Sequence, residues 1–164
     1  MVFISVLRIL HILSAIAMVG GVFARQIVRR QAGRSTDVRE LAVLTAAATR
    51  IERLLVIPGS SSAILFGAAL GLSIGAPVLG FIQGGDRNWL LAANIIILSI
   101  LVLIPAVFLP QRRRIDSALQ GALQAGRVTP ELQAALSENS GRFWHTYENV
   151  AVVLIVLLMS LRPF

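Results

Sequence analysis

The chain of 164 residues has no cysteine, and this absence excludes disulfides, thiolate catalysis, iron–sulfur clusters and cysteine–zinc sites. Lysine is also absent, so the formal charge of +7 comes from arginine alone. Charged residues make up only 14% of the chain, against about a quarter in water-soluble domains. Because 56% of the residues are hydrophobic, a membrane protein is the better interpretation, and we expect no nucleic-acid partner.

Four apolar runs are each close to the ~20 residues that cross a bilayer. They cover about residues 2–24, 54–76, 89–109 and 143–161. Lipid offers no hydrogen-bond partners to the backbone, so each run must be helical. The sequence therefore predicts an all-α, four-transmembrane-helix bundle that forms a single domain over residues 1–164. The first run lacks the basic start of a signal peptide and is longer than its apolar core, so we expect it to be retained.

Arginine is distributed unevenly between the two sides of these spans. Seven arginines lie in residues 25–53 and five in residues 111–142, whereas Arg8, Arg87 and Arg162 lie elsewhere. Because loops rich in arginine stay in the cytoplasm, both termini are predicted to be extracytoplasmic. The two Arg-rich loops are predicted to lie in the cytoplasm, where their arginines face anionic lipid headgroups. We therefore expect a multi-pass protein of the bacterial plasma (inner) membrane.

Both Arg-rich loops carry signals for helices. Asp37 with Glu40 three residues later has the form of a capping box, and the helix that it starts could continue into the second span. Thr129-Pro130-Glu131 supplies an N-cap, a proline at the first helical position and an acid in the first turn. We therefore expect helical loops.

The second span carries a small residue at every fourth position, which predicts a helix-packing face. Gly59, Ala63, Gly67, Gly71 and Gly75 would line one side with almost no side chain. A neighbouring helix could then approach closely and gain dispersion contacts, which drive association in lipid. Gly20 and Gly21 could act similarly in the first span, and Pro58 and Pro105 are expected to kink their helices.

His11 is the most informative polar residue within the spans. It lies about eight residues into the first span, roughly 12 Å deep at 1.5 Å per residue. Three interpretations stay open: a hydrogen bond to a neighbouring helix, a ligand for haem iron or another metal, and a proton relay.

His145, Glu148 and Asn149 share one face of the fourth span, at spacings of three and four residues. An interfacial polar turn, flanked by the belt residues Trp144 and Tyr147, is the favoured interpretation. His11 and His145 should lie more than ~10 Å apart along the membrane normal, so we do not expect one haem to be bound by both. We find no pattern for a metal site or for catalytic residues.

Three segments together resemble a bacterial family of predicted integral membrane proteins of unknown function. They are LRILHILSAIAMVGG, RIERLLVIPG and RFWHTYENVAVVLIVLLMSLRPF. That family is distantly similar to copper-resistance protein D and to the haem-containing membrane protoporphyrinogen oxidase. The resemblance to the oxidase implies haem binding by His11, and it matches the oxidase's other residues to Glu52, Arg53, Arg142, Glu148 and the tail Arg162-Pro163-Phe164.

Several positions depart from the oxidase pattern. Met18 replaces a tryptophan, and Ala93, beside Asn94, stands where the oxidase has an important lysine. Arg25, Gln26 and Arg29 replace the oxidase's basic, histidine-bearing end of the first span. These departures argue against oxidase activity.

Two functions follow as hypotheses. The first is a non-enzymatic accessory or scaffold subunit of an inner-membrane assembly, partnered by lipid and by other membrane subunits or a second copy. The alternative is a haem b protein acting in electron transfer or porphyrin oxidation, with His11 as the ligand. Passage of copper or a small solute is less favoured, because the three methionines are scattered and the spans carry no acidic ring.

Overall fold

The computed structural model describes residues 2–77, 79–83, 88–137 and 139–162, and these residues are almost entirely helical, with no strand among them. The elements are α1 (Val2–Ala32), α2 (Val38–Ile51), η1 (Glu52–Val56), α3 (Ile57–Ser73), η2 (Gly80–Gln83), α4 (Trp89–Leu103), η3 (Ile104–Phe108), α5 (Leu109–Ala125), α6 (Pro130–Ser137) and α7 (Asn139–Leu161). Within the described residues, four helical segments are long and apolar enough to cross a membrane. The prediction of an all-α protein with four transmembrane helices is confirmed.

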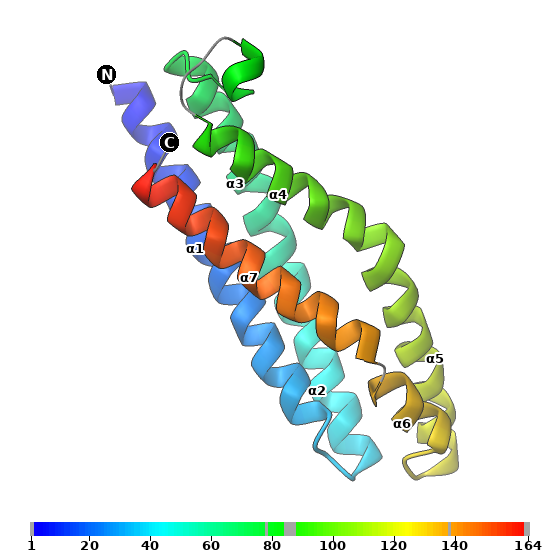
Figure 1. The fold of residues 1–164 in the computed structure, drawn as a ribbon. Coiled ribbons are helices and arrows are strands. Elements are labelled where there is room, and N and C mark those ends of the chain that lie inside the picture. Colours follow the sequence, from blue (N-terminus) through cyan, green and yellow to red (C-terminus); the bar gives the residue numbers. More distant parts are fainter. Residues whose placement is uncertain (1, 78, 84–87, 138, 163–164) are drawn as a thin grey trace.

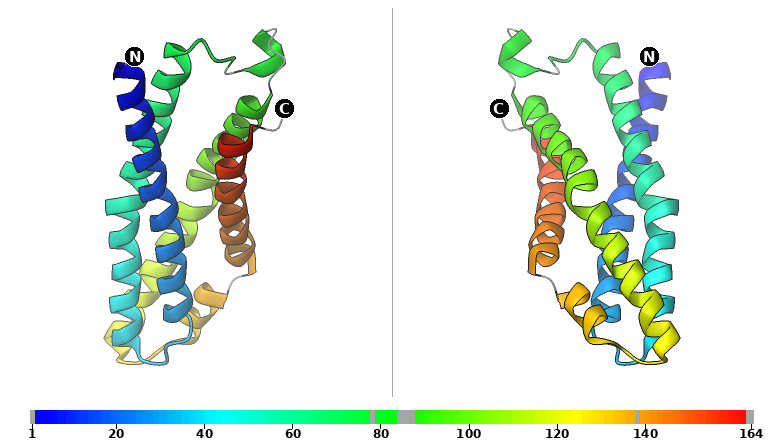
Figure 2. Two further views of the ribbon diagram at one scale, coloured as in Figure 1. Left: turned by 90° about the vertical axis from the view of Figure 1, so that its left-hand side faces the viewer. Right: turned by 90° about the vertical axis from the view of Figure 1, so that its right-hand side faces the viewer.

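The long helices form two pairs. α1 packs against the continuous helix α2–η1–α3, and α4–η3 packs against α7. Both chain ends lie at one end of the molecule, which we call the terminal end; the connections 33–37 and 126–129 lie at the opposite, loop end (Figure 1). The pairs lie close together at the loop end and diverge toward the terminal end (Figure 2). α1 with α7 and α2 with α5 provide the contacts between them.

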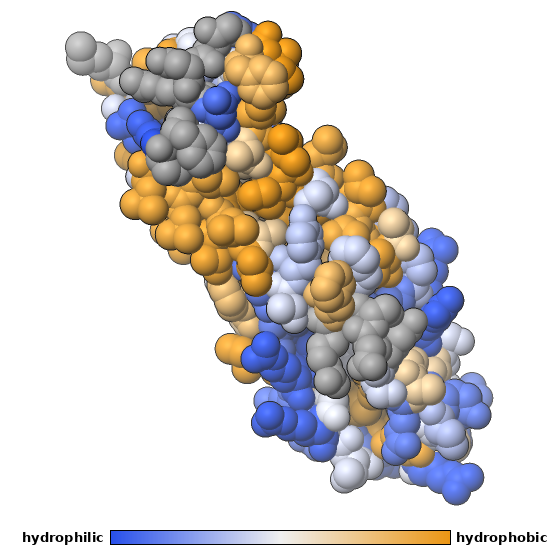
Figure 3. Space-filling model, viewed as in Figure 1, coloured by the Kyte–Doolittle hydropathy of each residue, from blue (hydrophilic) through white to orange (hydrophobic). Residues whose placement is uncertain are grey.

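The helices extend beyond the predicted spans at the loop end. α1 continues to Ala32 rather than ending at Ala24, and the second helix begins at Val38, well before Leu54. Asp37 caps it by accepting the backbone N–H of Arg39 at 2.8 Å, whereas Glu40 accepts the hydroxyl of Ser35 at 2.6 Å and so does not complete the expected box. The surface grows more hydrophilic toward this end (Figure 3).

Each π turn ends two residues before a proline. η1 ends at Val56 before Pro58, and η3 ends at Phe108 before Pro110. Proline lacks an N–H and its ring clashes with the carbonyl four residues earlier. A wider π turn accommodates that ring inside a helix. The helix of the third span therefore extends beyond residue 109, where the predicted span ends; the backbone stays helical to Ala125.

A small apolar core fastens the loop end. Val38, Leu41, Leu119, Ala122 and Leu132 are buried together, so α2, α5 and α6 contact one another outside the predicted spans. α6 begins as predicted, at Pro130. The N–H of Leu132 donates to the Thr129 hydroxyl at 3.4 Å. Glu131's own backbone N–H and then the Thr129 hydroxyl hold the pKa of that carboxyl below its usual value.

Small residues bring α1 and α3 into close contact. A methyl group on Gly59 would lie 2.7 Å from the backbone N of Met18, and one on Gly67 would lie 2.9 Å from Cε1 of His11. A methyl group on Gly21 would lie equally close to η1, whereas one on Gly20 would meet nothing within 4 Å outside its own helix. A side chain at Gly59 would therefore force the two helices apart, whereas one at Gly67 would displace the His11 ring.

Gly75 has a different role from the one expected of the fifth small residue. α3 ends at Ser73, and Gly75 has a φ of +63° with nothing within 4 Å of its added methyl group. Ala76 N–H donates to the Gly71 carbonyl at 2.9 Å, and Gly75 N–H donates to the Leu72 carbonyl at 3.3 Å. This is a Schellman C-cap, in which glycine terminates the helix. The packing face therefore ends at Gly71.

Candidate functional site

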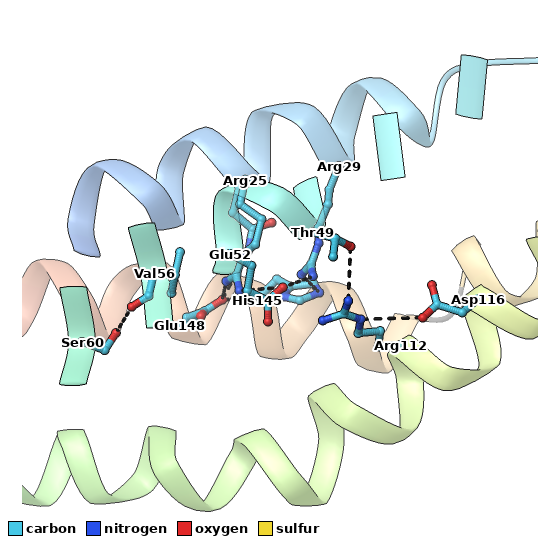
Figure 4. Close-up of polar contacts among 11 residues, drawn as sticks. Arg25, Arg29, Thr49, Glu52, Val56, Ser60, Arg112, Asp116, His145 and Glu148 are labelled. Atoms are coloured by element: carbon cyan, nitrogen blue, oxygen red, sulfur yellow. Dashed lines mark hydrogen bonds and ion pairs between the residues drawn. The ribbon is translucent and has the colours of Figure 1, made fainter. Parts of the chain in front are cut away.

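Charged side chains from three parts of the chain meet between the helix pairs at the loop end. Arg25 and Arg29 come from α1, Glu52 is the first residue of η1, and His145 and Glu148 come from α7 (Figure 4). On α1 and α7, helical spacing of three or four residues directs these side chains into the bundle. Charges buried in a membrane protein usually mark functional positions, so these five residues, the charge network, form the candidate site.

Arg25 lies at the centre of the charge network and is only 4% exposed. Its Nη2 donates to Oε2 of Glu148 at 2.5 Å, and its Nη1 lies 3.6 Å from Oε2 of Glu52. The adjacent Gln26 also donates to Glu148, at 3.4 Å. Among the described residues, Nε of Arg25 has no hydrogen-bond partner. The ion pair joins the first and last transmembrane helices directly.

Arg29 connects Glu52 with His145. Its Nη2 donates to Oε2 of Glu52 at 3.2 Å, and its Nη1 lies 3.3 Å from Nε2 of His145. Because guanidinium only donates, Nε2 of His145 must accept, which places the proton of the neutral ring on Nδ1. That Nδ1 lies 3.7 Å from Oε2 of Glu148, beyond a normal hydrogen bond. The imidazole stacks on Phe108 at a centroid distance of 5.2 Å.

The charges of the network balance, with two arginines against two glutamates when His145 is neutral.

A second polar contact lies farther toward the loop end. There, Arg112 Nε is 3.7 Å from Asp116 Oδ2, and Arg112 Nη2 donates to the Thr49 hydroxyl at 3.5 Å. It links α5 to α2. Within the described residues no three His, Cys, Asp or Glu side chains form a metal-binding group. The ion pairs and hydrogen bonds of the network join α1, η1 and α7 to one another.

The predicted polar cluster on α7 is part of this network rather than an interfacial turn. Glu148 is buried and bonded to Arg25, and His145 contacts Arg29. Asn149 does not join them, since its Oδ1 is buried with no partner among the described residues. The physical reason for the difference is that α1 continues past Ala24 and supplies the arginines that cover the cluster.

His11 lies in the α1–α3 interface, far from the charge network. Its Nδ1 is 2.9 Å from the carbonyl of Ala63. Because a carbonyl only accepts, Nδ1 carries the proton and Nε2 keeps a free lone pair. The network's Arg29 lies 18 residues farther along α1, about 27 Å at 1.5 Å per residue, so His11 and His145 are well separated, as expected.

Sequence reasoning missed Arg25, Gln26 and Glu52 as members of a buried site. The predicted end of the first span at residue 24 places Arg25 and Arg29 in a loop, and only the oxidase resemblance points to Glu52. The spacing of Val22, Arg25 and Gln26 is the signal that could have identified them. These residues follow one another at helical spacing, so Arg25 and Gln26 lie on the same buried face as Val22. Arg87 and the Pro163-Phe164 tail lie outside the described residues, as does the side chain of Arg142.

Comparison with known proteins gives one match. A family model described as "Predicted integral membrane protein (DUF2269)" matches residues 5–163. No curated protein and no solved structure matches the chain. The relation to the copper-resistance and oxidase families stays a prediction.

Proposed function

We propose that this chain, which belongs to the DUF2269 family of predicted integral membrane proteins, is a non-enzymatic subunit of a larger assembly in the bacterial inner membrane. Its two helix pairs would hold a transmembrane helix of another subunit between them at the terminal end. By the arginine distribution, that end faces away from the cytoplasm.

One observation carries this proposal: the face that α1 turns toward the second pair is covered at the loop end and uncovered at the terminal end. Gln26 and Val22 on this face are buried. Ile12 and Arg8 follow on the same face at helical spacing, and Ile12 is 49% exposed. The divergence of the pairs accounts for this change (Figure 2).

Arg8 favours a protein helix over lipid tails as the occupant of this space. It is exposed and forms no ion pair with a described residue, although it lies within the first span. An arginine within a span is costly unless it reaches the interface or pairs with an acid. A partner helix that carries a carboxylate at this depth would compensate its charge, whereas acyl chains would not.

The test places a photo-crosslinking amino acid at Ile12 and, separately, at Leu13 in native membranes. Leu13 is the control, because it is the next residue of the same helix and is 57% exposed, but it lies about 100° farther round the helix, on the side away from Gln26 and Arg8. We expect a discrete protein adduct from position 12 and lipid adducts from position 13. Lipid adducts alone at both positions would refute the proposal. An adduct of twice the chain's mass would identify a second copy as the partner.

A second candidate function, haem b binding, is favoured by the hydrogen bond of His11. A backbone carbonyl that holds the proton on Nδ1 orients Nε2 as a ligand, which is the usual support for a metal-bound histidine. One histidine suffices because the porphyrin supplies the other nitrogens, and the bound haem would carry single electrons. His11 would hold the iron and α3 would fix its ring.

Absorption spectra of the purified protein, oxidised and reduced, test this candidate. A Soret band that His11→Ala removes and His145→Ala retains would support haem binding by His11. A featureless spectrum after expression with ample haem would refute it and would leave the subunit proposal unaffected.

A further inference from the structure

A basic hollow lies between α2–η1 and α5, beside the charge network. Its volume is 460 Å³, which is larger than a phosphate group needs. The described residues that line it include three arginines, two threonines and one acid. These are Arg50, Arg53, Arg112, Thr45, Thr49 and Asp116. The ionisable side chains of the hollow therefore carry a net charge of +2.

The donors come from facing helices. Thr45, Thr49 and Arg53 repeat every four residues, so they lie along one face of the second helix. Arg112 reaches them from α5, where it is held by Asp116 and by the Thr49 hydroxyl. Guanidinium groups and hydroxyls arranged in this way match the oxygens of a phosphate.

The hollow also lies where the apolar surface begins. Leu54 forms part of its lining and is exposed, and the exposed residues Leu55 and Ile57 follow along the same helix. On the other wall, the exposed Leu109 precedes Arg112 by three residues. A phosphate held by the arginines would therefore have lipid-facing surface directly beside it. A soluble phosphate has no use for that surface, but a phospholipid covers it with acyl chains.

We propose that this hollow binds the phosphodiester headgroup of an anionic phospholipid. Arg53 and Arg112 contact the phosphate oxygens from opposite walls, Arg50 adds positive charge, and the acyl chains lie against Leu54. Basic pockets between transmembrane helices bind anionic lipids in this manner. The site is independent of the terminal end and of any helix bound there.

The experiment measures lipid binding to the full chain in detergent by native mass spectrometry, using phosphatidylglycerol, phosphatidylethanolamine and inorganic phosphate as separate probes. The double variant Arg50→Gln/Arg53→Gln is compared with Arg30→Gln/Arg39→Gln, which removes the same charge from exposed positions outside the hollow. We expect the first variant to bind phosphatidylglycerol about tenfold more weakly, the loss of roughly one charge-assisted hydrogen bond. The control variant should bind phosphatidylglycerol within about twofold of the parent protein, since it loses only long-range electrostatic attraction to the anionic lipid.

Three results would overturn the proposal. An equal loss in both variants would mean that the arginines act only through general attraction. If the parent protein retained phosphatidylethanolamine as well as phosphatidylglycerol, the hollow would have no preference for anionic lipid. Occupancy by inorganic phosphate that displaces phosphatidylglycerol at equal concentration would assign the hollow to a free phosphate.

Discussion

The loop end and the terminal end of this molecule are held together by different physical means. At the loop end, buried charges and a small apolar core connect elements of both helix pairs. At the terminal end, α1 and α3 stay together through glycine contacts, while the other pair lies apart (Figure 2). Lipid is as apolar as leucine, so apolar side chains alone cannot bring one helix to a defined partner. Small residues bring α1 and α3 into close contact, whereas buried charges and the apolar core of the loop end join the two pairs.

The largest effect should come from breaking the central ion pair. Arg25→Met would leave Glu148 buried and short of its main partner, at a cost of about 3–5 kcal/mol. The double variant Arg25→Met/Glu148→Met should recover most of this loss, because it removes both charges. Unfolding in mixed micelles, analysed as a double-mutant cycle, measures the coupling. Additive losses would show that the pair does not hold the two helix pairs together.

Enlarging a glycine in the α1–α3 interface should have an intermediate effect, and only within that pair. Gly59→Ala places a methyl group 2.7 Å from the backbone N of Met18, so we expect a loss of about 1–3 kcal/mol. Gly20→Ala is the control on α1, where the added methyl group meets nothing within 4 Å. There we expect no loss, since alanine is favoured over glycine in helices by up to about 1 kcal/mol. The same unfolding assay compares the two, and equal effects would argue against close helix contact.

The smallest effect should come from a neutral hydrogen bond within the second pair. Tyr147 and Ser99 lie 2.6 Å apart through their hydroxyl oxygens, and join α7 to α4. Tyr147→Phe should cost about 0.6 kcal/mol, the average for such bonds in membranes. Ser99→Ala also removes the bond from its hydroxyl to the Ile96 carbonyl at 2.7 Å, so it should cost at least as much, and the double variant should cost no more than Ser99→Ala alone. A loss comparable to that of Arg25→Met would mean that charge has no special role.

The sequence predicts the four spans well because lipid imposes both the length and the helical backbone. It predicts helix ends poorly, since Pro110 stops a helix only where no π turn accommodates its ring. Methyl groups added at Gly59 and Gly67 would lie close to α1, whereas Gly75 terminates its helix, and spacing alone cannot distinguish these roles of glycine.

The charge network could be predicted only in part. His145 and Glu148 were recognised as sharing a face, because that is a property of one helix. Their partners Arg25 and Glu52 belong to other helices, and the pairing depends on how those helices are arranged in space. Arginine counting assigns each arginine to a side of the membrane, and so it overlooks one that is buried among helices.

The bond between Arg25 and Glu148 also imposes an order on biosynthesis. The two residues are 123 positions apart in the chain. At about 5–20 residues per second, Arg25 leaves the ribosome roughly 6 to 25 s before Glu148. Glu52 lies 3.6 Å from Arg25 in the fold and only 27 positions after it in the chain, so it is made much sooner and can neutralise Arg25 in the interval. A chain that terminates before its last helix would thus retain an incompletely compensated arginine, and cellular quality control would have a chemical basis for removing it.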